Sequence, residues 1–271
     1  MEMSWQVKEK PPENPAGDDE SPWNIDPAME KGFQVRDLMR FFTVDIILIV
    51  LLKLLLGLGF FATPDHYVLA VIGSKVVLFA YLMWLIKDRR DAWPETGAAA
   101  RGPWWAWAGM IALYAGHFLA SPWIDRFNIN LMRQLYEAFD WAYVPAPQDI
   151  VVLIFEDIVN LPTRLALVFL TVFAGPFMEE LAFRGVGLDG FKRSFNTFWA
   201  VVWISLLFGL YHFSLPLLLP LSLLGVLFAV VRLVSGSLWC AVAMHCLHNG
   251  LALAITAHRL GVFDSWLSHW R

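Results

Sequence analysis

The sequence has few charged residues and almost no cysteine for its length of 271 residues. Asp, Glu, Lys and Arg together make up 16% of the chain, whereas hydrophobic residues make up 58%. A soluble globular domain carries about a quarter charged residues, so this composition excludes an ordinary soluble protein. The 14 Trp and 21 Phe residues suit aromatic belts at membrane interfaces as well as packing between helices. The composition therefore predicts a polytopic α-helical membrane protein.

The scarcity of cysteine and of clustered basic residues excludes two further classes of protein. Cys240 and Cys246 lie in one apolar segment, where a helix would point them to different faces, too far apart to bridge. We interpret both as packing residues rather than as a disulfide framework. No stripe of Lys and Arg runs along the sequence, so no nucleic-acid partner is expected.

Residues 1 to about 30 are rich in Pro, Asp and Glu and lack the basic start and apolar stretch of a signal peptide. Such a composition cannot bury a core, so we expect a disordered, solvated tail. Long apolar runs follow, each long enough or nearly so to cross the ~30 Å hydrocarbon core as a helix. They lie at 40–62, 66–86, 104–121, 162–188, 196–213, 215–234 and 237–258.

Two segments between the third and fourth runs are more polar. Residues 125–143 alternate charged with aromatic side chains, which is typical of an amphipathic helix lying in the membrane interface. Residues 148–160 form a further short segment or extend the fourth helix. The predicted fold class is therefore all-α: a polytopic transmembrane helical bundle with about seven, or eight, spans and one interfacial amphipathic helix.

Basic residues predict how the bundle is oriented. By the positive-inside rule, loops rich in Lys and Arg lie on the cytoplasmic side, which also places the N-terminus there. The residues on which this depends are Lys31, Arg36, Arg40, Lys87, Arg89, Arg90, Arg101, Lys192 and Arg193.

Three charged residues lie within the first two predicted spans. Asp45 and Lys53 fall in the first span, and Lys75 falls in the second. Ionisable residues at membrane depth pair with each other, reach to the interface or belong to a functional relay. No further polar group recurs at helical spacing around them, so we expect structural pairing or snorkelling rather than a relay.

The most unusual stretch of the sequence is an apolar run interrupted by Glu179, Glu180 and Arg184. A charged side chain at bilayer depth is costly and normally faces the bundle interior or a water-filled cavity. On a helix Glu180 and Arg184 are neighbours at i,i+4 and can form an ion pair. Glu179 points about 100° away and has no such partner. One carboxylate is thus held, and the other is left to act on a water.

Two later spans add histidines and an amide. His212 lies four residues after Phe208, on the same face of its predicted helix. In the last span His245 and Asn249 share a face, with His248 beside them. Polar groups of acid–base type on three separate spans predict one shared, buried site.

The three motifs resemble those of a known family. In order and spacing, Glu179-Glu180-x-x-x-Arg184, Phe208-x-x-x-His212 and His245-x-x-x-Asn249 are similar to the motifs of the CAAX-protease and bacteriocin-processing intramembrane proteases, also called the Abi or type II CAAX endopeptidase family. The resemblance covers roughly residues 160–258. The chain then divides into a tail at 1–35, N-terminal helices and an interfacial segment at 36–160, a catalytic core at 160–258 and a C-terminal tail at 259–271.

The resemblance implies hydrolysis of a peptide bond in a membrane-associated protein or peptide, without a cofactor. Glu179 would be the general base for a water that His212 helps to hold. The pair of Glu180 and Arg184 would fix the geometry. A carboxylate removed from bulk water binds a proton more readily, which suits a base working near neutral pH.

The resemblance further assigns His245 and Asn249 to the stabilisation of the oxyanion. A metal-dependent alternative stands beside it, because Glu179, His212 and His245 also form a two-histidine, one-carboxylate set that would suit zinc. No His-Glu-x-x-His element is present, and one glutamate could not easily serve as both base and ligand. We therefore prefer the metal-free mechanism.

Two functions of other classes stay open at this point. A catalytically silent membrane scaffold or immunity protein could reuse the fold, although every motif residue is retained. A transporter is less favoured, because the sequence shows no internal repeat and no matched pair of broken helices. The chain's modest length and the lack of organellar targeting favour a multi-pass protein of a prokaryotic inner membrane.

Overall fold

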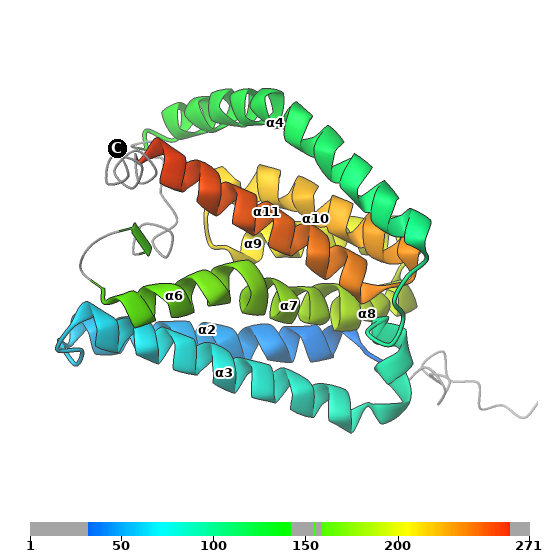
Figure 1. The fold of residues 1–271 in the computed structure, drawn as a ribbon, viewed down its shortest axis with the longest axis horizontal. Helices are drawn as coiled ribbons and strands as arrows, with labels where there is room; N and C mark the ends of the chain where they lie inside the picture. Colours follow the sequence, from blue (N-terminus) through cyan, green and yellow to red (C-terminus); the bar gives the residue numbers. More distant parts are fainter. Residues whose placement is uncertain (1–31, 142–153, 156–158, 261–271) are drawn as a thin grey trace, which may run out of the picture.

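The structure is a computed structural model that describes residues 32–141, 154–155 and 159–260, which form a bundle of helices (Figure 1). The all-α prediction is confirmed, since the described residues contain no strand. The disorder predicted for residues 1 to about 30 concerns residues outside the described ones, and so do residues 261–271 of the C-terminal tail predicted at 259–271.

The helices are α2 (Val35–Gly57), α3 (Pro64–Asp88), the 3-10 helix η1 (Arg90–Thr96), α4 (Trp104–Ala138), α6 (Leu161–Phe169), the π-helix η2 (Leu170–Ala174), α7 (Gly175–Glu180), the π-helix η3 (Leu181–Gly187), α8 (Leu188–Ser194), α9 (Thr197–Tyr211), α10 (Leu215–Ser235) and α11 (Leu238–Arg259).

Helices occupy all seven ranges that the apolar runs predict. Four of the described helical stretches are long and apolar enough to cross a membrane: α3, the continuous helix Leu161–Ser194, α10 and α11. The apolar helix α9 has only 15 residues, α2 carries charged residues along its length, and α4 carries them in its second half. Seven spans therefore stay a prediction, whereas a membrane-spanning bundle follows directly from the four long helices.

The third predicted span and the predicted interfacial helix are one element in the structure. The helix α4 runs for 35 residues without a break and ends at Ala138. Pro122 lies inside it, and a proline removes one helical hydrogen bond and kinks a helix without having to end it. Figure 1 shows α4 bending as it passes over α10 and α11. The amphipathic stretch at 125–143 is thus mainly the second half of a bent helix.

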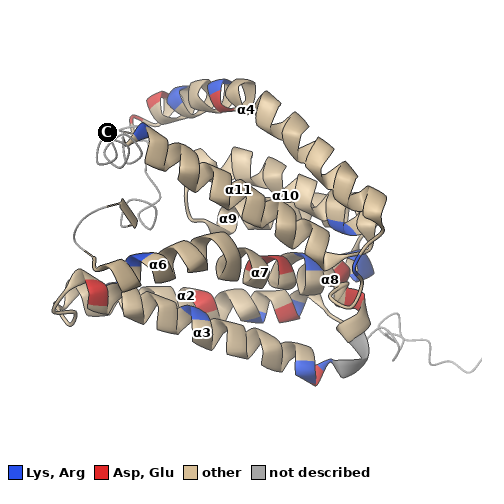
Figure 2. Cartoon of the chain, viewed as in Figure 1, with Lys and Arg blue, Asp and Glu red and all other residues tan. Residues whose placement is uncertain are grey.

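Most charged residues lie near the ends of the helices, as the colours in Figure 2 show. The exceptions lie on α7 and in the middle of α2 and α3, where Glu179, Glu180, Asp45 and Lys75 fall within apolar helices. These exceptions include the residues that the sequence singles out as candidates for chemistry.

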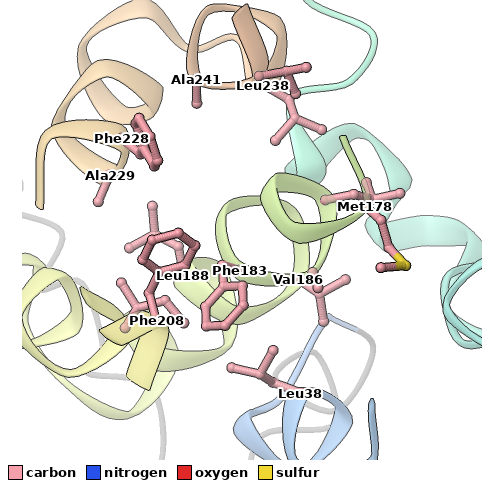
Figure 3. Packing of buried hydrophobic residues seen from close by; sticks show 14 of the residues in the cluster. Leu38, Met178, Phe183, Val186, Leu188, Phe208, Phe228, Ala229, Leu238 and Ala241 are labelled. Atoms are coloured by element: carbon pink, nitrogen blue, oxygen red, sulfur yellow. The ribbon is translucent and has the colours of Figure 1, made fainter. Parts of the chain in front are cut away.

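The core beneath these charges consists of aromatic side chains from different helices. Phe183 of η3 meets Phe208 of α9 edge to face at 5.1 Å, and Phe208 meets Phe228 of α10 at 5.9 Å. All three are fully buried. Figure 3 shows them turned toward one space, with Leu38 of α2 at its edge. This core fixes the helices that carry the motifs relative to one another.

The helices α9 and α10 lie close together because each has a glycine where it contacts the backbone of the other. A Cβ atom at Gly225 would lie 3.1 Å from the Cα atom of Ser205, and one at Gly209 would lie 2.6 Å from the carbonyl oxygen of Leu218. Backbone cannot yield as a flexible side chain can, so α9 and α10 pack at this distance only with glycine at both positions.

The substitution Gly209→Ala should therefore destabilise the protein by about 1–3 kcal/mol, the usual cost of overpacking a core. The matched control is Gly116→Ala in α4, where an added Cβ meets nothing within 4 Å. That change should be neutral or stabilising by up to about 1 kcal/mol, because alanine favours a helix. Thermal unfolding of the purified protein in detergent measures both, and equal effects would contradict the close α9–α10 contact.

Candidate active site

The helix Leu161–Ser194 contains two π-helical turns, one on each side of the paired glutamates. The N–H of Gly175 donates to the carbonyl of Leu170, and the N–H of Leu188 donates to the carbonyl of Phe183. A π turn inserts an extra residue into a helix, often at a functional site, and so rotates the side chains that follow it. The sequence predicts a uniform helix here and misses both turns. Together they set the direction in which α7 presents its carboxylates.

The predicted ion pair of Glu180 and Arg184 is present and fully buried. The Nη1 of Arg184 donates to Oε1 of Glu180 at 3.0 Å, and its Nη2 donates to the carbonyl oxygen of Gly225 at 2.9 Å. The guanidinium carbon lies 4.5 Å from the ring centre of Phe208 and 5.1 Å from that of Phe228. Arg184 is thus held by a carboxylate, a carbonyl of α10 and two aromatic faces.

His245 shares the same carboxylate oxygen, which the sequence does not reveal. Its Nδ1 lies 2.8 Å from Oε1 of Glu180, and its ring stacks on Phe228 at 4.7 Å. With Glu180 ionised, Nδ1–H is the donor, and the ring turns Nε2 toward Glu179. The distance from Nε2 to Oε2 of Glu179 is 3.9 Å, too long for a direct hydrogen bond.

His212 is placed by the end of α9. The helix ends at Tyr211 rather than at the predicted residue 213, and His212 is its C-cap. The backbone N–H of His212 donates to the carbonyl oxygen of Gly209 at 3.3 Å, so the carbonyl oxygen of Phe208 is left for the side chain of His212, whose Nδ1 lies 2.8 Å from it. A carbonyl only accepts, hence Nδ1 carries the proton. In the neutral ring Nε2 is then an acceptor.

Asn249 is held by the carbonyl oxygen of Thr171, which has no helical N–H partner because of the first π turn. The N–H of Gly175 donates to the carbonyl oxygen of Leu170, and Pro176 has no N–H that could donate to Thr171. The carbonyl oxygen of Thr171 instead accepts from Nδ2 of Asn249 at 2.8 Å. An amide nitrogen carries two hydrogens, so one N–H of Asn249 holds the side chain and the second is available to a ligand.

The predicted residues meet at one cavity of about 220 Å³. Glu179, His212, His245 and Asn249 line it, whereas Glu180 and Arg184 are fully buried directly behind its wall. The remaining lining is mainly apolar and includes Leu170, Pro176, Met178, Phe208, Leu221, Leu224 and Ala252. Three distant helical segments therefore converge as the motifs predict.

Two further titratable residues line this cavity, Lys75 and His248. The expected pairing of Lys75 is confirmed, since its Nζ donates to both carboxylate oxygens of Asp45 at 2.9 and 3.2 Å. The hydroxyl of Tyr211 also donates to Asp45. This network joins α2 and α3 to the end of α9, one residue before His212. The sequence does not show that Lys75 faces the cavity, because nothing in α3 itself resembles a motif.

The zinc alternative finds no ready ligand set. In the described residues, no group of three or more His, Cys, Asp or Glu side chains is arranged to hold a metal ion. Glu179, His212 and His245 line a common cavity, but their side chains are not arranged around one ion position.

Replacing Arg184 by leucine should destabilise the protein by about 3–5 kcal/mol, because it leaves Glu180 as a buried charge without its cation. The matched control is Lys192→Leu, which removes the more exposed partner of Asp189 in α8 and should cost less than about 1 kcal/mol. Denaturant unfolding in detergent compares the two. Equal losses would show that the buried pair does not hold the site.

A comparison with protein families places the motifs in context. Residues 161–251 match the family described as Type II CAAX prenyl endopeptidase Rce1-like, and this range contains all six predicted site residues. Comparisons with curated proteins and with solved structures gave no match. The matched range falls within the 160–258 core that the three motifs delimit. Over this range the chain is therefore similar to the CAAX-protease family.

Proposed function

We propose that the protein is an intramembrane endopeptidase that uses Glu179 to activate a water against a peptide bond of a membrane-associated protein or peptide. The observation that supports this most is the state of Glu179. Its Oε2 is buried and has no hydrogen-bond partner among the described residues, and it faces the cavity that His212, His245 and Asn249 also line. The family match supports the peptidase class.

The geometry suits a water as nucleophile. The 3.9 Å between Oε2 of Glu179 and Nε2 of His245 leaves room for an oxygen that contacts both groups. The water attacks the scissile carbonyl carbon while Glu179 takes its proton and later passes that proton to the leaving amine. The unprotonated Nε2 of His212 accepts the second hydrogen of the water and so orients it.

The developing oxyanion needs donors that are already in place. The second amide N–H of Asn249 is neutral and always a donor, and His245 adds another donor when Nε2 carries a proton. Each such donor contributes about 3 kcal/mol to the transition state in a water-poor site. Glu180 and Arg184 do not touch the substrate. They hold the His245 ring, the first through Nδ1 and the second by fixing Glu180.

The orientation of the protein in the membrane belongs to the same proposal. Basic residues gather where α3 ends and α2 begins, and Arg89 there lies 3.6 Å from Asp37. Arg193, at the end of α8, pairs with Glu95 at 2.6 Å. By the positive-inside rule this end faces the cytoplasm, so the start of α2 lies on the cytoplasmic side of the membrane.

Glu179→Gln and His212→Ala should each lower cleavage at least about 100-fold, because they remove the base and its water partner. Neither should lower the unfolding temperature by more than a few degrees. The control is Glu137→Gln on the exposed end of α4. Mass spectrometry of membrane-protein termini in cells expressing each variant identifies the cleaved bond. Termini that persist unchanged in both variants would place the site elsewhere, and complementation of a deletion by Glu179→Gln would favour a scaffold.

Treatment with a chelator should leave cleavage within about twofold of the untreated enzyme, because the proposed steps need no metal. The measurement uses purified protein shown by elemental analysis to be metal-free, and a peptide that spans the bond identified above. Loss of cleavage that zinc alone restores would replace the glutamate mechanism by the zinc-dependent one.

A further inference from the structure

A second cavity of about 260 Å³ adjoins the one that holds the candidate catalytic groups. The two cavities share four lining residues, Leu221 and Leu224 of α10 and His248 and Ala252 of α11. Each of these side chains therefore forms part of both walls. The second cavity lies between α4, α10 and α11, and its α4 wall falls outside the matched family range of 161–251.

The α4 wall of this second cavity is polar at regular intervals. His117, Ser121 and Asp125 line it, and their spacing of four residues places them on one face of the helix. Asp125 is exposed, whereas Ser121 and His117 are half-buried. The polar face thus leads from the outer, charged half of α4 toward the interior of the bundle.

His248 continues this polar face into the catalytic cavity. Its Nδ1 shares a 3.3 Å hydrogen bond with the hydroxyl of Tyr114, which also lines the second cavity. The ring centre of His248 lies 6.3 Å from that of His117. The family motifs leave His248 without a role, yet it is the one titratable side chain in the walls of both cavities.

Polar side chains within a membrane bundle are costly unless they pair or face water. A polar cavity holds water when it offers two to four partners and at least about 15 Å³ for each molecule. A volume of about 260 Å³ lined by the polar groups of α4 and by His248 meets both conditions. Hydrolysis consumes one water for each bond cleaved, and the surrounding hydrocarbon cannot supply it.

We propose that the second cavity is the route by which water reaches the catalytic cavity, with His248 at the passage between them. The purpose of the route rests on the proposed hydrolysis. Its existence is tested without measuring cleavage, so the failure of one proposal is distinguishable from the failure of the other.

The test measures how fast a water-soluble thiol reagent reaches a cysteine in the catalytic cavity. Cys240 and Cys246 are free thiols and are first replaced by alanine. Met178→Cys then serves as the reporter, because Met178 lines the catalytic cavity and is otherwise buried. The probe is sulfonatoethyl methanethiosulfonate, an anion that does not cross lipid, added to protein reconstituted in vesicles.

We expect Ser121→Trp, which fills the second cavity, to slow modification of the reporter at least tenfold. The matched control is Ala115→Trp, at an exposed position of α4 that does not line the cavity, and it should leave the rate unchanged. The thiol of Ser121→Cys should itself react at least tenfold faster than the thiol of Ala115→Cys. If Ser121→Trp lowers the unfolding temperature, Ser121→Leu takes its place with the same expectation.

Two results would overturn the route. One is a reporter rate that Ser121→Trp leaves unchanged, and the other is a reporter that the reagent never modifies. Slower modification in Ser121→Trp supports the route even if no substrate is ever cleaved, in which case only the proposed hydrolysis fails.

Discussion

One buried oxygen atom holds the candidate site together. Oε1 of Glu180 accepts from both Arg184 and His245, and Arg184 in turn donates to the backbone of α10 at Gly225. The helix Leu161–Ser194 is thereby tied to α10 and α11 by charge-assisted hydrogen bonds. In an apolar interior the removal of either charge would leave the other buried and uncompensated. The positions of His245 and α10 therefore depend on the buried Glu180–Arg184 pair, which does not line the cavity.

The two neighbouring glutamates have different surroundings, because successive residues of a helix point about 100° apart. Glu180 is fully buried and paired with Arg184, whereas Glu179 lines the cavity and has no Lys or Arg paired with it among the described residues. The first π turn acts on Asn249, since it frees the Thr171 carbonyl that fixes this side chain. This local distortion thus anchors a candidate oxyanion donor.

Part of this arrangement could be predicted from the sequence. The i,i+4 spacing of Glu180 and Arg184 sufficed to predict their ion pair, and the shared face of His245 and Asn249 follows from helical periodicity. The π turns could not be predicted, because inserting one residue into a turn leaves an apolar run apolar. The bond between Glu180 and His245 joins residues 65 positions apart, and no local pattern encodes it. The polar face of α4 was missed because the expected span ended at 121, between His117 and Asp125.

The first three long helices complete a site whose chemistry lies in the matched range. Lys75 of α3 lines the catalytic cavity, and Asp45 of α2 binds both Lys75 and Tyr211, the residue before His212. The helix α4 encloses the second cavity against α10 and α11. A peptidase within a bilayer requires that its buried charges are compensated and that water reaches its active site. Its acid–base residues alone provide neither. For the proposed hydrolysis, Lys75 and Asp45 would contribute to the charge balance, and the α4 wall of the second cavity would supply the water. These residues lie outside 161–251, so the proposed chemistry depends on more of the chain than the range that carries the family motifs.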